Sequence, residues 1–182
     1  MEKDVERKGP FGLWMGMSLQ DLGSEYRELA PAKYKIETVP KPHSAFETYI
    51  AMVAPKNGLC WIKALAPTLQ TNVFGASLRA AFDSMEEKLN VTYGKSKRTD
   101  FIMSGSLWTD PQYWMQSLIS QDRFLMTEWA PKHGSRLKDS LTSIALIVSA
   151  TDTTAGHISI EYSFENMKTA EEELAAAEDD AL

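Results

Sequence analysis

The sequence is poor in the residues from which disulfides and metal sites are built. Its 182 residues include one cysteine, Cys60, and three histidines. One cysteine excludes an internal disulfide and any zinc site that needs several cysteines. Cys60 lies in the apolar run 59–62, which predicts a core residue rather than a reactive thiol. The histidines, His43, His133 and His157, are far apart and form no His-Glu-x-x-His or His-x-His motif, so we expect no metal and no cofactor.

Long apolar segments are also lacking. Residues 1–8 carry mixed charge and no apolar segment follows them, which is unlike a signal peptide. No window approaches the roughly 18 apolar residues that a membrane span needs. These features predict a cytoplasmic location and no membrane partner.

Positive charge is not in excess. The formal net charge is −6, and the segment from Glu165 to Leu182, with seven acids and one base, accounts for all of it. Residues 1–164 are therefore neutral overall. Because nucleic-acid binding needs a basic surface that displaces counterions, we expect no nucleic-acid partner.

Alternating and turn-forming residues predict strands in two parts of the chain. Residues 46–54 and 59–65 flank Pro55-Lys56-Asn57-Gly58, a sequence typical of a tight hairpin turn. Near the C-terminus, segments 124–129, 141–150 and 157–164 are predicted strands. In the last of them, Ile158, Ile160, Tyr162 and Phe164 alternate with more polar residues.

Apolar residues at helical spacing predict a long helix over 74–93, with the buried stripe Phe74, Leu78, Phe82, Met85 and Leu89. Glu86 and Glu87 lie on its solvated side, and Gly94 is its C-cap. Ser18 and Asp21 have capping-box spacing and predict an earlier short helix. A polar connection over 95–106 leads to a third helix with Asp110 as N-cap, Pro111 at its first position, and the buried stripe Trp114, Met115, Leu118 and Ile119.

Strands and helices cluster rather than alternate, so the predicted fold class is α+β, with an antiparallel sheet packed by helices in two layers. The order also allows two related α–β halves. The predicted organisation is a charged leader over 1–10, a single α+β domain over 11–165, and an acidic helical tail over 166–182. Because the tail has few large apolar residues, we expect it to fray or project.

The phrase Gly12-Leu13-Trp14-Met15-Gly16-Met17-Ser18-Leu19-Gln20-Asp21-Leu22 resembles the start of domains in the β-lactamase-inhibitor-protein and SmpA/OmlA outer-membrane-lipoprotein group. The phrase 89–95, which ends in Tyr-Gly-Lys, is similar to one in uncharacterised bacterial relatives. The matched residues cover about a tenth of the chain. The resemblance implies a helix-on-sheet module that binds proteins or peptides through its sheet and loops. The chain departs from the group in lacking the lipoproteins' signal peptide and the inhibitor's paired cysteines, and no functional residue is carried over.

No motif for catalysis is recognisable. Gly94-Lys95-Ser96 follows a predicted helix, whereas a phosphate-binding loop precedes one and needs an earlier glycine where Leu89 stands. Ser106 and Ser135 lack the Gly-x-Ser-x-Gly context of an activated serine. We therefore assign no catalytic residue.

A partner-binding surface is the better hypothesis. Five tryptophans are many for a chain of this size, and Trp108 lies at a loop-to-helix junction, where exposed aromatics often anchor interfaces. The alternative is that the tryptophans only fill the core or stabilise loops. Lys95, Lys97 and Arg98 form the one local basic cluster, which either meets an acidic partner or only completes a helix C-terminus. With Tyr113, these four residues are the predicted partner-binding set.

The leading hypothesis is a non-enzymatic protein-binding module of inhibitor, immunity or adaptor type. It would use a sheet face and the 95–111 loop, with the acidic tail tuning contact or solubility. One alternative is a small-molecule-binding or hydrolytic enzyme that assembles His43 with Glu47, or His133 with Asp139. Another is a structural homodimer that closes an apolar sheet face on itself.

Overall fold

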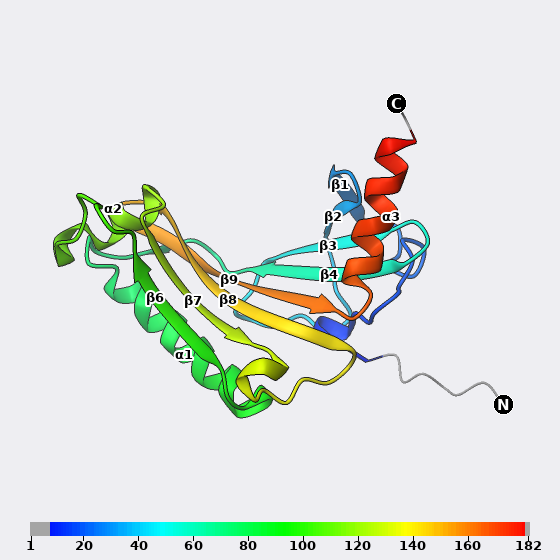
Figure 1. Cartoon of the computed structure of the whole chain (residues 1–182), viewed down its shortest axis with the longest axis horizontal. Helices are drawn as coiled ribbons and strands as arrows, with labels where there is room; N and C mark the ends of the chain where they lie inside the picture. Colours follow the sequence, from blue (N-terminus) through cyan, green and yellow to red (C-terminus); the bar gives the residue numbers. More distant parts are fainter. Residues whose placement is uncertain (1–7, 181–182) are drawn as a thin grey trace. The chain divides into compact units, whose positions relative to one another are not determined.

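The computed structural model describes residues 8–180 and confirms the α+β class, with nine strands in one open antiparallel sheet and three α-helices (Figure 1). Most of the predicted leader, 1–7, and the end of the predicted tail, 181–182, lie outside the described residues. The strands are β1 (Tyr26–Ala30), β2 (Lys33–Ile36), β3 (Thr48–Ala54), β4 (Gly58–Leu65), β5 (Leu69–Gln70), β6 (Lys97–Ile102), β7 (Arg123–Trp129), β8 (Leu141–Asp152) and β9 (Ala155–Phe164), and the helices are α1 (Ala76–Tyr93), α2 (Trp114–Ile119) and α3 (Met167–Asp179).

The strand order is β1-β2-β3-β4-β9-β8-β7-β6, with β5 also paired to β9. The edge strands are thus β1 and β6. Contacts divide the described chain into two compact units. The first unit comprises residues 8–64, 138–142 and 162–180, and the second comprises 65–137 and 143–161. The units are not successive halves of the chain, because each is built from more than one segment.

In the first unit, the predicted hairpin forms as β3 and β4, joined by a turn that ends at Gly58. Gly58 has φ +68°, and a Cβ there would lie 2.3 Å from the Gly16 carbonyl oxygen. Only glycine meets both conditions. The side chains of Tyr49, Ala51 and Val53 on β3 are buried, so this face of the strand contributes to the core.

The acidic tail does not fray or project as expected; it forms α3 and packs in the first unit. Ala170 is fully buried, in one cluster with Ala54 and Cys60, and Met167 and Leu174 pack against this cluster. A small side chain allows the helix to approach the strands closely, so few large apolar residues are needed. Cys60 is buried as predicted, and burial raises the pKa of its thiol to about 11.

A carboxylate of α3 also closes the hairpin turn. Glu173 accepts hydrogen bonds from the backbone N–H of Lys56 at 2.7 Å and of Asn57 at 3.0 Å, and from the Asn57 side chain at 2.6 Å. Desolvation raises the pKa of Glu173, but these hydrogen bonds outweigh it and the net pKa is lowered. The Glu173 carboxylate therefore anchors α3 to the hairpin turn, in addition to the apolar contacts of the helix.

The short helix predicted after Ser18 is wrong. The capping-box bonds do form, from the Ser18 N–H and hydroxyl to the Asp21 carboxylate, both at 2.9 Å. The segment that they close is a turn, which ends at Gly23 with φ +91°. A capping box satisfies the first N–H groups, but without an apolar stripe beyond it no helix continues.

In the second unit, α1 lies along one face of β6, β7 and β8 (Figure 1). Its buried stripe is that of the prediction from Leu78 onward, and Gly94 caps its end with φ +79°. The helix begins at Ala76, so Phe74 lies outside it and is exposed. Gly75 precedes it with φ +67°, and a Cβ there would lie 2.2 Å from the Trp114 ring. The buried positions of the helix are Leu78, Phe82, Met85, Leu89 and Tyr93.

The connection predicted over 95–106 contains a strand, β6, instead of only loop. It pairs with β7 from Lys97 opposite Glu128 to Ile102 opposite Arg123. The strand was not predicted because its sequence is polar, and charged residues are common on edge strands. The third predicted helix begins with a 3₁₀ turn, Pro111–Tyr113, and continues as α2.

Candidate binding surface of the second unit

The predicted partner-binding set falls into two places. Trp108 and Tyr113 follow the end of β6, and their rings meet edge to face with centroids 5.3 Å apart. Lys95, Lys97 and Arg98 lie before or at its start. Since a strand rises about 3.3 Å per residue, the length of β6, about 17 Å, separates the two groups along the strand. The aromatic pair is thus brought together, and the basic cluster is not part of it.

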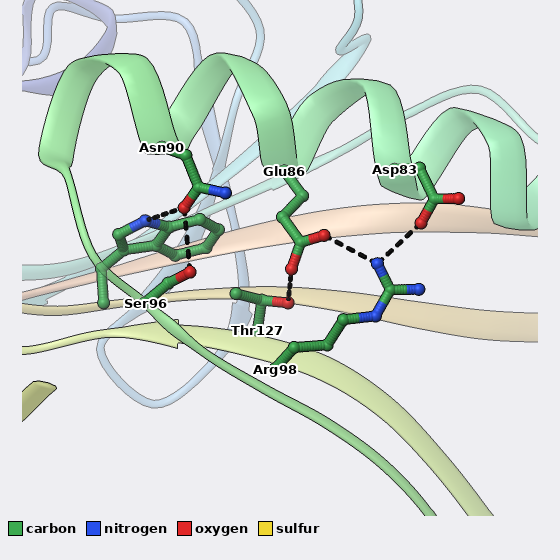
Figure 2. Close-up of polar contacts among 7 residues, drawn as sticks. Asp83, Glu86, Asn90, Ser96, Arg98 and Thr127 are labelled. Atoms are coloured by element: carbon green, nitrogen blue, oxygen red, sulfur yellow. Dashed lines mark hydrogen bonds and ion pairs between the residues drawn. The ribbon is translucent and has the colours of Figure 1, made fainter.

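Arg98 has internal partners. Its guanidinium lies 2.7 Å from the carboxylates of both Asp83 and Glu86 (Figure 2). It also lies 5.0 Å from the centroid of the Phe82 ring. Desolvation lowers the pKa of Arg98, but the two carboxylates raise it more, so the guanidinium stays charged. Arg98 therefore joins β6 to α1 instead of facing a partner.

Three further hydrogen bonds complete this junction (Figure 2). Glu86 accepts a hydrogen bond from the buried hydroxyl of Thr127, and Asn90 accepts bonds from the Trp129 indole at 3.1 Å and the Ser96 hydroxyl at 2.9 Å. Glu86 therefore does not lie on a solvated face, and the prediction from the sequence is wrong at this residue. The spacing of Asp83, Glu86 and Asn90 places them on one side of the helix. This spacing is the feature of the sequence from which the junction could have been predicted.

Lys95 and Lys97 have exposed side chains. The Lys95 carbonyl accepts a hydrogen bond from the Ser135 hydroxyl, which also accepts one from the Ala130 N–H at 2.9 Å. Ser135 is therefore occupied in fixing the backbone. It has no histidine partner and no role as a nucleophile follows from its contacts.

The histidine–acid pairs of the enzyme alternative do not form. His133 Nε2 lies 2.7 Å from Glu128 Oε2, not from Asp139, and hydrogen bonding to His133 lowers the pKa of Glu128, with Lys132 adding to the effect. The Nδ1 of His43 accepts the Ala45 N–H at 3.1 Å. Among residues 8–180, no group of three or more His, Cys, Asp or Glu side chains could hold a metal ion.

A concentration of exposed apolar side chains distinguishes the region from 101 to 124. Six of the eleven exposed large hydrophobic side chains in the described chain lie in it, and Leu107 is 83% exposed. Phe101 pairs with Phe124 across two strands, and Ile119 lines the same groove as Phe124. Exposed apolar patches often mark interaction sites. We call these six residues the apolar surface: Phe101, Met103, Leu107, Tyr113, Ile119 and Phe124.

The surface continues into a groove between α2 and the strands β7 and β8. The groove has a volume of about 510 Å³, and its lining includes Leu118, Phe124, Met126 and Ile147. Phe124 and Met126 alternate with the buried Leu125, so they lie on the face of β7 opposite α1. Phe101 stands opposite Phe124 in the β6–β7 register and extends the apolar strip to the edge strand.

Charge is nearly absent here. Between Phe101 and Gln121, Asp110 is the single charged residue. Arg123, which follows, is bound to the Asp100 carboxylate and to the Ser117 hydroxyl. The lack of charge over 101–121 is the sequence signal from which this surface could have been predicted.

A smaller pocket opens beside Trp108. It has a volume of about 320 Å³. The loop that carries Trp108 is held by hydrogen bonds: the Ser106 hydroxyl donates to the Asp122 carboxylate at 2.6 Å and accepts the Trp108 N–H at 3.1 Å. The lining residues are Val73, Trp108, Gln112, Tyr113, Gln116 and Thr153.

Comparisons with known proteins give no family model, no curated protein and no solved structure that matches the chain. The resemblance to the β-lactamase-inhibitor-protein and SmpA/OmlA group therefore stays a prediction. No helix among residues 8–180 has the length and apolar character needed to cross a membrane.

Proposed function

We propose that the chain is a non-enzymatic protein-binding module, of inhibitor, immunity or adaptor type, and that its apolar surface docks on a partner protein. The observation that carries this is the gathering of six exposed large hydrophobic side chains within 24 residues. Exposing such side chains to water has a cost, roughly 25 cal/mol per Å² of apolar area, which binding recovers.

The chemistry of the surface defines the partner in outline. Because Asp110 is the one charged residue in 101–121, the complementary patch is apolar and carries little charge. The groove beside α2 would receive side chains of the partner, and Leu107 would insert into a pocket of the partner as an anchor. The exposed Lys95 and Lys97 lie at the other end of β6 and contribute at most to the rim.

Site-specific photo-cross-linking tests the proposal. A photoreactive benzoylphenylalanine replaces Leu107 in one variant and Val91, which is 79% exposed on α1, in a matched control. In cells of the source organism we expect a discrete protein adduct from position 107 and none from position 91. Adducts of equal yield at both positions, or at neither, contradict the proposal.

The same experiment distinguishes the homodimer. An adduct with the mass of two chains at position 107, together with a dimer by light scattering of the purified protein, would make the partner a second copy. An adduct with a different protein and a monomer in solution would favour an adaptor or inhibitor.

The cytoplasmic location belongs to this proposal as well. It is supported by Cys60, the sole cysteine, which is buried as a free thiol. Fractionation of cells that express the tagged chain checks it, and recovery of the protein outside the cytoplasmic fraction would overturn it.

A further inference from the structure

Strand β6 forms one edge of the sheet, and among residues 8–180 its single neighbouring strand is β7 (Figure 1). The N–H and C=O groups on its other side can therefore pair with a further strand. Charged side chains on an edge strand usually oppose such pairing, because most incoming strands leave them without partners. β6 carries charges of both signs, so it admits only a strand that supplies opposite charges at matching positions.

The two faces of β6 carry different side chains. Arg98 contacts α1, and side chains alternate along a strand, so Asp100 lies on the same face as Arg98. Lys97, Thr99 and Phe101 lie on the opposite face, which α1 does not cover. An incoming strand has to match both rows of side chains.

Arg98 and Asp100 can each form a further ion pair. Arg98 binds Asp83 and Glu86 through Nη1, and its other nitrogens make no hydrogen bond to another described residue. Asp100 accepts from Arg123 through Oδ1, and its Oδ2 likewise has no bond within the described chain. Their side chains are 39% and 36% exposed. A strand that completes this edge therefore needs an acid opposite Arg98 and a base opposite Asp100, two residues apart.

β6 itself meets this requirement when a second β6 runs antiparallel to it. In a pair centred on Thr99, Arg98 of each strand stands opposite Asp100 of the other. Opposite charges on directly paired residues stabilise a sheet, whereas like charges destabilise it. An unrelated strand carries an acid and a base at this spacing only by chance, but a second copy of this chain always does. The charge pattern thus selects a second copy.

Symmetry limits the register of such a pair. A twofold axis normal to the sheet keeps each side chain on its own face, so the pair is centred on a residue and never between two. Centring on Lys97 or Arg98 brings two cations together, and centring on Asp100 brings two carboxylates together. Centring on Phe101 leaves three residues of β6 in the pair. Centring on Thr99 keeps five, 97–101, without a like-charge pair.

We therefore propose that β6 pairs antiparallel with β6 of a second copy of this chain, about a twofold axis at Thr99. Arg98 of each copy then binds Asp100 of the other copy in addition to the carboxylates of its own α1. Leu107 and Phe124 lie outside the paired strands, so this inference goes beyond the proposed function and does not depend on it. The dimer carries the apolar surface twice, which would favour a partner with two docking sites.

Cysteine cross-linking tests the register. Lys97→Cys and Phe101→Cys each change an exposed residue, and the native Cys60 is buried. Directly opposite Cβ atoms lie about 4.5–5.5 Å apart, which a disulfide bridges after a small shift. Under mild oxidation we expect an equimolar mixture of the two variants to form the mixed disulfide dimer, identified by its mass. Each variant alone should form little, because identical positions lie about 13 Å apart along the strands. Val91→Cys, on exposed α1 surface, gives the collision background.

Sedimentation equilibrium of the chain without added cysteines tests the charge pairs. Asp100→Asn still accepts a hydrogen bond from Arg123 but loses both symmetric ion pairs of the dimer. We expect the dimer dissociation constant to rise about tenfold, equivalent to ~1.4 kcal/mol. Glu87→Gln removes the same charge from an exposed position on α1 and should leave the dissociation constant unchanged.

Four results would each overturn the inference. The first is a mixed 97–101 disulfide whose yield equals the Val91→Cys background. The second is a higher yield from Phe101→Cys alone, which would indicate another register or a dimer closed through the apolar surface. The third is an equal effect of Asp100→Asn and Glu87→Gln on dimerisation. The fourth is a chain that stays monomeric up to about 1 mM.

Discussion

The two units differ in whether a helix covers their apolar strand faces. In the first unit, α3 covers part of the β3–β4 hairpin, with Ala170 fully buried, and Glu173 satisfies the turn. In the second unit, Phe101 and Phe124 stand opposite each other on neighbouring strands, and 51% and 46% of their surfaces stay exposed. Apolar side chains on neighbouring strands thus lie in a closed core in one unit and on an open surface in the other. What differs is whether the chain supplies a covering helix.

Breaking the closed face should have the largest effect. Ala170→Asp places a carboxylate without a partner among Ala54 and Cys60, and we expect the free energy of unfolding to fall by about 3–5 kcal/mol. Chemical denaturation measures it. Ala175→Asp, on an exposed position of the same helix, is the control, and equal losses in both variants would mean that α3 is not docked.

The junction between α1 and the sheet gives the next effect. Glu86→Ala leaves the buried Thr127 hydroxyl without its acceptor and Arg98 with one carboxylate, so we expect a loss of about 2 kcal/mol in the free energy of unfolding. Glu87→Ala removes the same charge from the exposed side and should stay within about 0.5 kcal/mol. Equal values for the two variants would show that the Glu86 contacts contribute nothing.

The closure of the hairpin turn by Glu173 predicts a pH dependence. The pKa of Glu173 lies below its ordinary 4.5 in the folded chain. Its stabilising effect is therefore complete above pH 4.5 and is lost as the pH falls through the lower, folded-state pKa. Thermal unfolding should show wild type more stable than Glu173→Gln at neutral pH, with the difference shrinking below pH 4.5. A difference that is constant with pH, or equal to that of Glu178→Gln, would contradict this.

Changing the open surface should hardly affect stability. Leu107→Ser replaces a side chain that is 83% exposed, and we expect a change within about 0.5 kcal/mol in the free energy of unfolding. Its effect should be seen instead as a loss of partner binding. A loss of more than 2 kcal/mol would show that Leu107 supports the fold and is not reserved for a partner.

Local signals in the sequence predicted the elements that depend on them. The Asn57-Gly58 turn, the α1 stripe and the alternation along β9 needed no information from distant residues. The docking of α3 could not be predicted in this way, because Ala170 is small and its burial depends on close approach to Cys60. Strand β6 was missed because its sequence is polar, as the edge position favours.

For the candidate site, the aromatic pair was predicted but its surroundings were not. Trp108 and Tyr113 were predicted as partner-binding residues, and in the structure their rings are in contact. Arg98 was assigned to the same surface because its charge alone does not show that Asp83 and Glu86 on α1 lie beside it. Phe101 belongs to the surface because it stands opposite Phe124 in the strand register. A local sequence pattern cannot predict this pairing.

Hydroxyl-radical footprinting of the protein inside cells and after purification tests the central claim most directly. It compares the oxidation of Phe101, Leu107 and Phe124 with that of Val91 in both states. We predict that the first three are protected in cells and oxidised in the purified chain, while Val91 is oxidised equally in both. Equal oxidation of all four residues in the two states would contradict a docked apolar surface.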